Sequence, residues 1–287
     1  MTDAAAAHDT ALPADTVWAE RDSWVDRIPR SVAMLAIFVV FIAIWQAVHV
    51  FEIVSKIILP SPWETALELV VVGQNFLTGG YLLPAFWITT QEVAIGFALA
   101  TFLGFTLGTI VGETSLGERA VLPYLVAIDT MPKVAFAPLF ISWLGFGISS
   151  KVALAAFIAT FPIVVGTAAG LHAADENARM LFRTMGASRW QTLLKLKIPT
   201  GLPHFFTGLK IAAIGVVAGA ITAEFLGGGT GMGHLIRTAA SQLDTSRVFA
   251  LILYLSLLGL GTFWTVVWIQ RRFVFWHKDT HRQENLG

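Results

Sequence analysis

Long apolar runs alternate with short polar connections along most of this 287-residue chain. Six of the runs are about 20 residues or longer, the length that an α-helix needs to cross the hydrocarbon core of a bilayer. They cover residues 31–50, 84–111, 120–144, 151–171, 204–225 and 248–270. The pattern therefore predicts an all-α, polytopic membrane protein with six transmembrane helices.

Two interruptions modify this pattern. The third run contains Met131-Pro132 and Pro138, and we expect it to be broken or kinked, because proline removes a backbone donor and clashes with the preceding turn. A further apolar stretch, residues 63–72, follows a Leu-Pro-Ser-Pro motif. It is too short to cross the bilayer, so we expect a helix at the membrane interface.

Residues 175–203 form a long polar, basic segment within the apolar sequence. It has two anions, Asp175 and Glu176, and five cations: Arg179, Arg183, Arg189, Lys195 and Lys197. The pattern predicts a helix over residues 178–185, a turn at Gly186, and a second helix over 189–198 that Ser188 caps and Pro199 ends. Apolar residues are interspersed with these charges: Leu181, Phe182, Met185, Trp190, Leu193 and Leu194. They indicate a surface for a partner, with a plain basic loop as the alternative.

Composition supports the membrane assignment. Hydrophobic residues make up 55% of the chain and charged residues 13%, with a mean hydropathy of +0.69, whereas soluble domains carry about 25% charged residues. The net charge of zero gives no reason to expect nucleic acid as a partner. There is no cysteine, and the seven histidines are scattered, so no metal site is indicated. The Gly-rich residues 227–233 lack the spacing of a nucleotide-binding loop and predict a flexible outer loop.

The distribution of Lys and Arg predicts the orientation. With both termini in the cytoplasm, thirteen cations lie on that side and four on the other. The four are Lys56, Lys151, Arg237 and Arg247. We expect a cytoplasmic N-terminal tail at residues 1–30, a transmembrane domain at 31–272 and a cytoplasmic C-terminal tail at 273–287. The basic segment 175–203 then lies in the cytoplasm.

Charged groups within the spans are costly and often functional. They are Glu92, Asp129, Lys133 and Lys210. The group Asp129, Met131, Pro132 and Lys133 surrounds the expected break and is our candidate for a translocation path, with a purely structural kink as the alternative. Glu224 ends the fifth span, where it lines an outer gate or pairs with a neighbour such as Arg237.

Several motifs together resemble one family, the permeases of binding-protein-dependent ABC importers, and in particular the nitrate, sulfonate and taurine branch with its pyrimidine and riboflavin permeases. The stretch RTMGASRWQTLLKLKIP, followed by GLPHFFTGLKIA, is similar to the coupling loop of that family. The other matching motifs are Leu-Pro-Ser-Pro at 59–62, PKVAFAPL at 132–139, Gly-Phe-Gly at 145–147 and Ala-Glu-Phe at 223–225.

The resemblance implies a type I ABC importer permease that forms a homodimer in the bacterial inner membrane. Small residues at 96–112 and 208–219 would allow close helix contacts in such a dimer. Separate ABC ATPase subunits would bind ATP-Mg, so no cofactor is expected on this chain, and an extracytoplasmic binding protein would deliver a small organic solute. The implied ATPase-docking residues are Glu176, Arg179, Leu181, Phe182, Arg183, Met185, Gly186, Ala187, Ser188 and Arg189.

One departure concerns the acid of the coupling loop. Met180-Leu181-Phe182 stand where the family has Glu-Ala-Ala. Glu176, one helical turn earlier, is a possible substitute, because residues four apart share a helix face. The alternative function is a stand-alone secondary transporter or channel, which predicts internal repeats that the sequence does not display. No motif for intramembrane hydrolysis occurs, so we expect no enzyme.

Overall fold

The computed structural model describes residues 29–276. Most of the expected N-terminal tail and the last part of the C-terminal tail lie outside the described residues. So do four cations used to predict the orientation: Arg21, Arg27, Lys278 and Arg282. The chain divides into two units after Ile53. The first contains α1 (Arg30–Val50), an apolar helix with no buried residue in its span window, as expected of a span that faces lipid.

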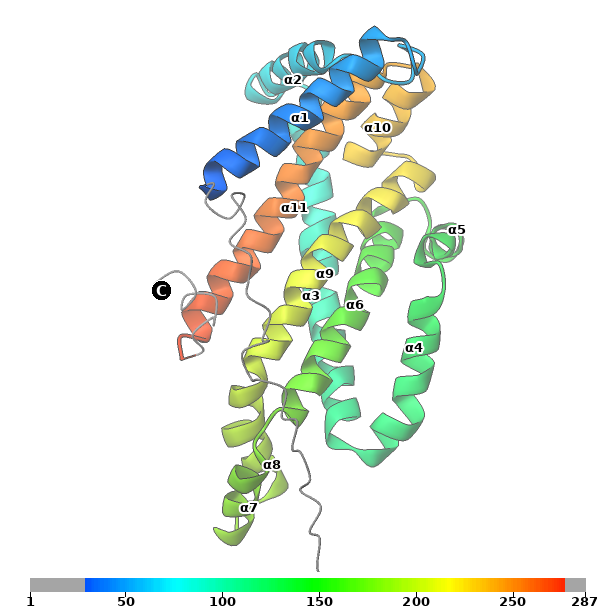
Figure 1. Cartoon of the computed structure of the whole chain (residues 1–287). Helices are drawn as coiled ribbons and strands as arrows, with labels where there is room; N and C mark the ends of the chain where they lie inside the picture. The colour runs from blue at the N-terminus through cyan, green and yellow to red at the C-terminus, as the bar shows by residue number, and fades with distance from the viewer. Residues whose placement is uncertain (1–28, 277–287) are drawn as a thin grey trace, which may run out of the picture. The chain divides into compact units, whose positions relative to one another are not determined.

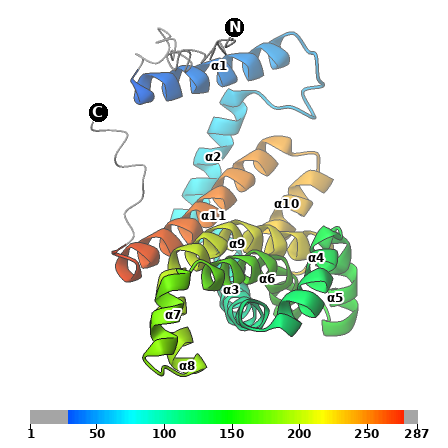
Figure 2. The same cartoon turned by 60° about the horizontal axis from the view of Figure 1, so that its bottom comes forward.

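The second unit contains the remaining described helices. They are α2 (Pro62–Leu77), α3 (Leu82–Glu113), α4 (Leu122–Thr130), α5 (Ala137–Leu144), α6 (Ile148–His172), α7 (Glu176–Thr184), α8 (Arg189–Thr192), α9 (Ile198–Gly227), α10 (Met232–Ser241) and α11 (Thr245–Phe273). The long helices α3, α6 and α9 run side by side, and α7 and α8 project beyond one end of them (Figures 1 and 2).

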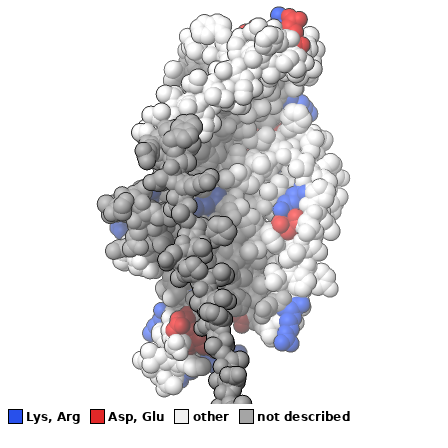
Figure 3. All heavy atoms as spheres, in the orientation of Figure 1, with Lys and Arg blue, Asp and Glu red and all other residues white. Residues whose placement is uncertain are grey.

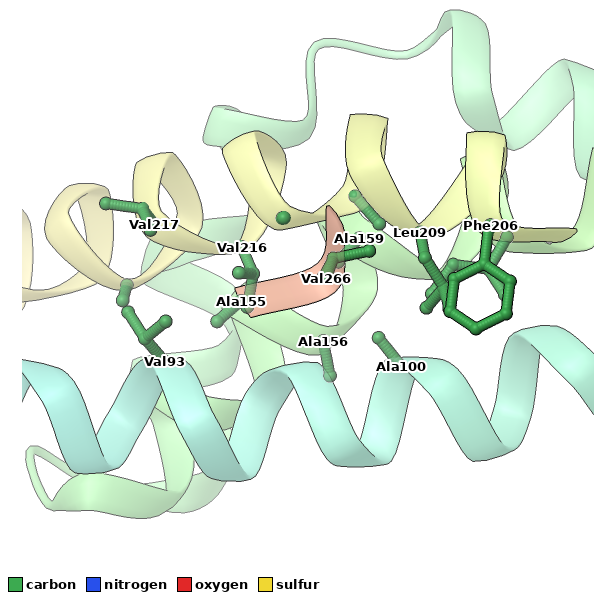
Figure 4. Close-up of a cluster of buried hydrophobic side chains, with 14 of the residues drawn as sticks. Val93, Ala100, Ala155, Ala156, Ala159, Phe206, Leu209, Val216, Val217 and Val266 are labelled. Carbon is green, nitrogen blue, oxygen red and sulfur yellow. The ribbon is translucent and has the colours of Figure 1, made fainter. Parts of the chain in front are cut away.

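The core lies around α6, which packs most extensively against α9 and α3. Its small side chains Ala155, Ala156 and Ala159 lie between Ala100 of α3 and Val216 of α9, all of them buried (Figure 4). Small residues at helix contacts let the backbones approach closely, which is how helices associate in a membrane.

Glycines bring these helices into backbone contact. A Cβ atom at Gly170 of α6 would lie 2.6 Å from the carbonyl oxygen of Gly201 in α9. The expectation that the glycines of residues 96–112 and 208–219 serve contacts between two copies is wrong for most of them. These pack against α6 of the same chain: Gly96, Gly104, Gly108, Gly112, Gly208 and Gly219.

The structure confirms five of the six predicted spans and the break in the third. Most of the described surface visible in Figure 3 belongs to uncharged residues, as expected of helices that face lipid. Within the part of the chain that the structure describes, five helices are long and apolar enough to cross a membrane, and a sixth span is possible if the pair Arg119–Thr130 and Lys133–Leu144 counts as one. The two halves of that pair are bent by 90°. The short helix expected at residues 63–72 is longer and forms α2, which begins with a capping box between Ser61 and Glu64 and packs on α11.

The expectation that Pro199 ends the second helix of the basic segment is wrong. The helix runs without a break over Arg189–Gly227, 39 residues, and includes both Pro199 and Pro203. A π-helical turn at Leu193–Lys197 ends two residues before Pro199. Such a turn shifts the hydrogen-bond register of the backbone. Pro199 is the second residue of the α-helical stretch that follows it, where the missing proline donor is tolerated.

Candidate functional site

The basic segment folds as the predicted helix, Gly turn and helix. The Asp175 carboxylate caps α7 by accepting a hydrogen bond of 3.1 Å from the backbone N–H of Ala178. Gly186 has a φ of +75°, a left-handed conformation that glycine adopts without steric cost. Ser188 and Gln191 then form a capping box that begins α8. Local sequence therefore fixes the shape of this segment, independently of any partner.

The candidate docking residues lie on two faces of the segment. The apolar face is exposed, with Leu181 at 57%, Met185 at 74% and Trp190 at 72% of their full accessible surface. Phe182 is partly buried. The opposite face of α7 carries Arg179 and Arg183, which lie four residues apart and so share one side of the helix. The segment thus exposes its apolar side chains on one face, and its arginines lie on the face toward the rest of the chain.

The arginine face borders a polar pocket of 610 Å³. Its other wall is the end of α3 and the connection to α4, from Glu113 to Leu116, together with Lys197 at the base of α9. Lys197 donates a hydrogen bond of 2.7 Å to the Glu113 carboxylate. Sequence reasoning missed this wall because Glu113 lies far from the basic segment in the chain.

Glu176 lies in the first turn of α7, where its exposed carboxylate is favoured by the positive end of the helix dipole. Its substitution for the acid of the family pattern stays a prediction. Gly186, Ala187 and Ser188 form the turn between α7 and α8, and Ala187 also lines the pocket.

The break in the third span lies at Met131 and Pro132, whose extended backbone separates α4 from the 3₁₀ turn that precedes α5. The side chains of Asp129 and Lys133 form an ion pair across it. Asp129 borders two cavities. One of 370 Å³ also includes Lys133, and the other, of 440 Å³, lies among α4, α6 and α9.

The 440 Å³ cavity contains two polar residues that sequence reasoning missed, His204 and Thr207 of α9. They are three residues apart and both exposed, so they share one face of the helix. The signal in the sequence was the presence of polar side chains at helical spacing at the start of an apolar span. Asp129, His204 and Thr207 give this cavity a carboxylate, an imidazole and a hydroxyl, groups that could hydrogen-bond a solute.

Glu224 is not near these cavities but at the opposite end of α9 from α7 and α8 (Figure 1). Its side chain is completely buried, accepting a hydrogen bond of 2.6 Å from the Thr89 hydroxyl and another of 2.6 Å from the backbone N–H of Gly233. The suggested pairing with Arg237 is wrong: within residues 29–276, Arg237 makes no ion pair and lies 3.5 Å from His234. A pathway role for Glu224 stays a prediction.

Lys151 was counted among the outside cations, at the first residue of the fourth expected span. It is 3% exposed, lies 3.1 Å from the Glu92 carboxylate and donates a hydrogen bond of 2.8 Å to the Thr230 carbonyl. With Thr89 and Glu224 these residues form a buried polar cluster that joins α3, α6, α9 and the loop before α10. Its burial makes it a structural connection at the Glu224 end of the bundle.

An all-helical membrane bundle with a broken third span and a projecting helical pair at one end defines the membrane-spanning class of type I ABC importer proteins. The chain belongs to the family "Binding-protein-dependent transport system inner membrane component", which it matches over residues 100–275. It is therefore an inner-membrane, multi-pass permease of an ABC importer for small solutes.

Relatives from several bacteria cover most of the chain. The formylaminopyrimidine transport permease ThiX of Halalkalibacterium halodurans is 37% identical over 84% of this chain and 94% of its own length. The putative aliphatic sulfonates permease SsuC of Bacillus subtilis is 30% identical over 84% and 86%. The fold resembles that of a chain from the inward-facing MetNI methionine ABC transporter, with a TM-score of 0.58, 17% identity, and coverage of 67% of this chain and 95% of that one.

Proposed function

We propose that this permease forms a homodimer and couples solute import to a separate ATPase that docks on α7 and α8. The observation that carries the proposal is the exposed apolar face of this pair, formed by Leu181, Met185 and Trp190. Contiguous exposed apolar residues on a structured element mark an interaction surface, and aromatic anchors often dominate its binding energy. The Lys and Arg asymmetry supports an orientation with both termini in the cytoplasm, in which this face would lie where ATP is available.

The continuous helix Arg189–Gly227 suggests how docking drives transport. Because α8 passes through the π turn directly into α9, a displacement of α8 by the ATPase is transmitted along one rigid element. That element carries His204 and Thr207 of the 440 Å³ cavity. We therefore expect ATP-driven closure of the ATPase dimer to move the cavity wall and change the side from which the cavity is accessible.

The names of the relatives support a small solute as the substrate. They include permeases for formylaminopyrimidine, aliphatic sulfonates and riboflavin, and also nitrate import permeases. We favour a small organic solute, with a nitrate-like anion as the alternative, and an extracytoplasmic binding protein would supply it. In the pathway, Asp129, Met131, Pro132 and Lys133 would lie at the broken span.

Co-purification of the full chain with its ATPase tests the docking. The variant Leu181→Asp with Met185→Asp should lose most of the ATPase, because two charges are introduced into an apolar interface. Lys195→Gln, an exposed residue of the same segment, is the matched control and should retain it. Undiminished ATPase binding by the double variant would refute docking on this face. The mass of the purified complex tests the homodimer.

A further inference from the structure

The polar pocket of 610 Å³ between α7–α8 and the end of α3 has an unbalanced charge. Its lining includes four cations and one carboxylate, Glu113. Lys197 is paired with that carboxylate. The three arginines left over are Arg179, Arg183 and Arg189, and none of them forms an ion pair within residues 29–276. The pocket therefore has a formal charge of +3.

The three arginines line the same pocket, and their positive charges favour the binding of an anion. Arg179 and Arg183 come from α7, and Arg189 begins α8, so the Gly186 turn folds them onto one wall. The Nε atom of Arg179 is buried and has no hydrogen-bond partner within residues 29–276. A buried donor without a partner costs free energy, and three guanidinium groups around one cavity repel each other. A bound anion would accept a hydrogen bond from the Arg179 Nε atom and would reduce the repulsion between the guanidinium groups.

Phosphate is the anion that this lining fits. Guanidinium groups bind phosphate oxygens through paired, charge-assisted hydrogen bonds. The volume of 610 Å³ falls in the range of small-ligand sites, about 300–1,000 Å³. The pocket lies where α3 ends and α9 begins, at the ends of two membrane-spanning helices. Lipid headgroups lie near the ends of membrane-spanning helices, and basic clusters at such positions attract anionic lipids.

We propose that this basic pocket binds a phosphate group, carried either by an anionic phospholipid or by a soluble phosphate. The site goes beyond the docking function, because its arginines lie on the side of α7 opposite the apolar docking face. A bound phosphate would bridge α7, α8 and the α3–α4 connection. It would thereby restrict the movement of the coupling segment, which gives the membrane or the cytoplasm a means to regulate transport.

The test uses the full chain in nanodiscs of phosphatidylcholine, with and without phosphatidylglycerol, and native mass spectrometry to count retained lipids. A second arm titrates inorganic phosphate into the phosphatidylcholine sample. Wild type should retain phosphatidylglycerol or bind phosphate, and the arm that responds identifies the source. Arg179→Gln with Arg183→Gln should weaken this binding about tenfold or more, through the loss of charge-assisted hydrogen bonds. Lys195→Gln should bind as wild type does.

The single variant Arg183→Gln, at an exposed position, repeats the test with little risk to folding. The proposal is overturned if neither probe binds, or if the arginine variants bind both probes as tightly as wild type. It is also overturned if these variants lose the ATPase while wild type binds neither probe, since the pocket would then take a carboxylate of the partner. Leu181→Asp with Met185→Asp separates the two proposals, because it should lose the ATPase and keep phosphate binding.

Discussion

Lys197, at the base of the helix that carries the coupling segment, donates a hydrogen bond of 2.7 Å to Glu113 at the end of α3. Both side chains are mostly buried, at 17% and 22% exposed. The pair joins the 39-residue helix Arg189–Gly227 to the first long helix of the core. It connects α9 to α3 directly, in addition to the packing of both helices on α6.

Reversal of Lys197 to Glu should lower the thermal stability of the purified protein and reduce uptake relative to ATP hydrolysis. Two carboxylates then face each other, and a partly screened ion pair is worth about 1 kcal/mol or less before repulsion is added. The exchange Glu113→Lys with Lys197→Glu should restore both properties, because the pair is formed again with its charges reversed. If the exchange variant behaves like the single variant, the charge pairing is not what these residues supply.

Lys151→Met should destabilise the protein strongly, by about 3–5 kcal/mol, because it leaves the Glu92 carboxylate buried without its cation. Thermal unfolding in detergent measures the loss. The double variant Glu92→Met with Lys151→Met removes both charges and should be markedly more stable than the single one. Equal instability of the two variants would contradict the assignment of the pair as mutually compensating.

Gly231→Ala should destabilise the protein more than Gly229→Ala. Both glycines have positive φ, at 118° and 90°, so each substitution introduces backbone strain of about 1–3 kcal/mol. Only at Gly231 would the new methyl group also collide with the Glu224 carboxylate, whereas the space around Gly229 is open, with its nearest contact at 3.9 Å. The difference in melting temperature between the two variants isolates this collision. No difference would mean that the loop shifts freely away from Glu224.

The sequence was sufficient for the spans, the broken third helix and the helix–turn–helix of residues 175–203. These features depend on local chemistry: apolar length, the proline at 132, the glycine at 186 and the cap at Ser188. Pairs of residues that are distant in the sequence could not be predicted in this way. Lys151 stands at the edge of an apolar run, as a loop cation would, and only packing of α6 on α3 brings Glu92 to it.

Pro199 illustrates a second limit of prediction from the sequence alone. Proline usually ends a helix, but whether a π turn absorbs it depends on how the whole helix fits its neighbours. At this position the buried Leu193 and the Lys197–Glu113 pair hold the helix against the bundle. Packing therefore decides against the local rule, and the outcome is a continuous helix.

Substitutions in the 440 Å³ cavity should impair transport without affecting ATPase docking. Thr207→Val removes the hydroxyl with little change in shape, and His204→Ala removes the imidazole; both positions are exposed, so folding should be preserved. Uptake in proteoliposomes with the cognate binding protein should fall, by about tenfold where a hydrogen bond to the solute is lost. Thr200→Val, on the same helix but outside the cavity, is the control. Unchanged uptake in both cavity variants would exclude this cavity from the path.

Softening of the π turn should uncouple ATP hydrolysis from transport. Leu194 and Lys195 lie within that turn and are exposed, so glycine at both positions loosens the junction of α8 and α9 without opening the core. Each glycine costs about 1 kcal/mol of helix stability relative to alanine. The matched variant Leu194→Ala with Lys195→Ala removes the same side chains and keeps the helix stiff. We expect both variants to bind the ATPase equally and only the glycine variant to hydrolyse ATP with reduced uptake. If both transport equally well, rigid transmission along the helix Arg189–Gly227 is not the means of coupling.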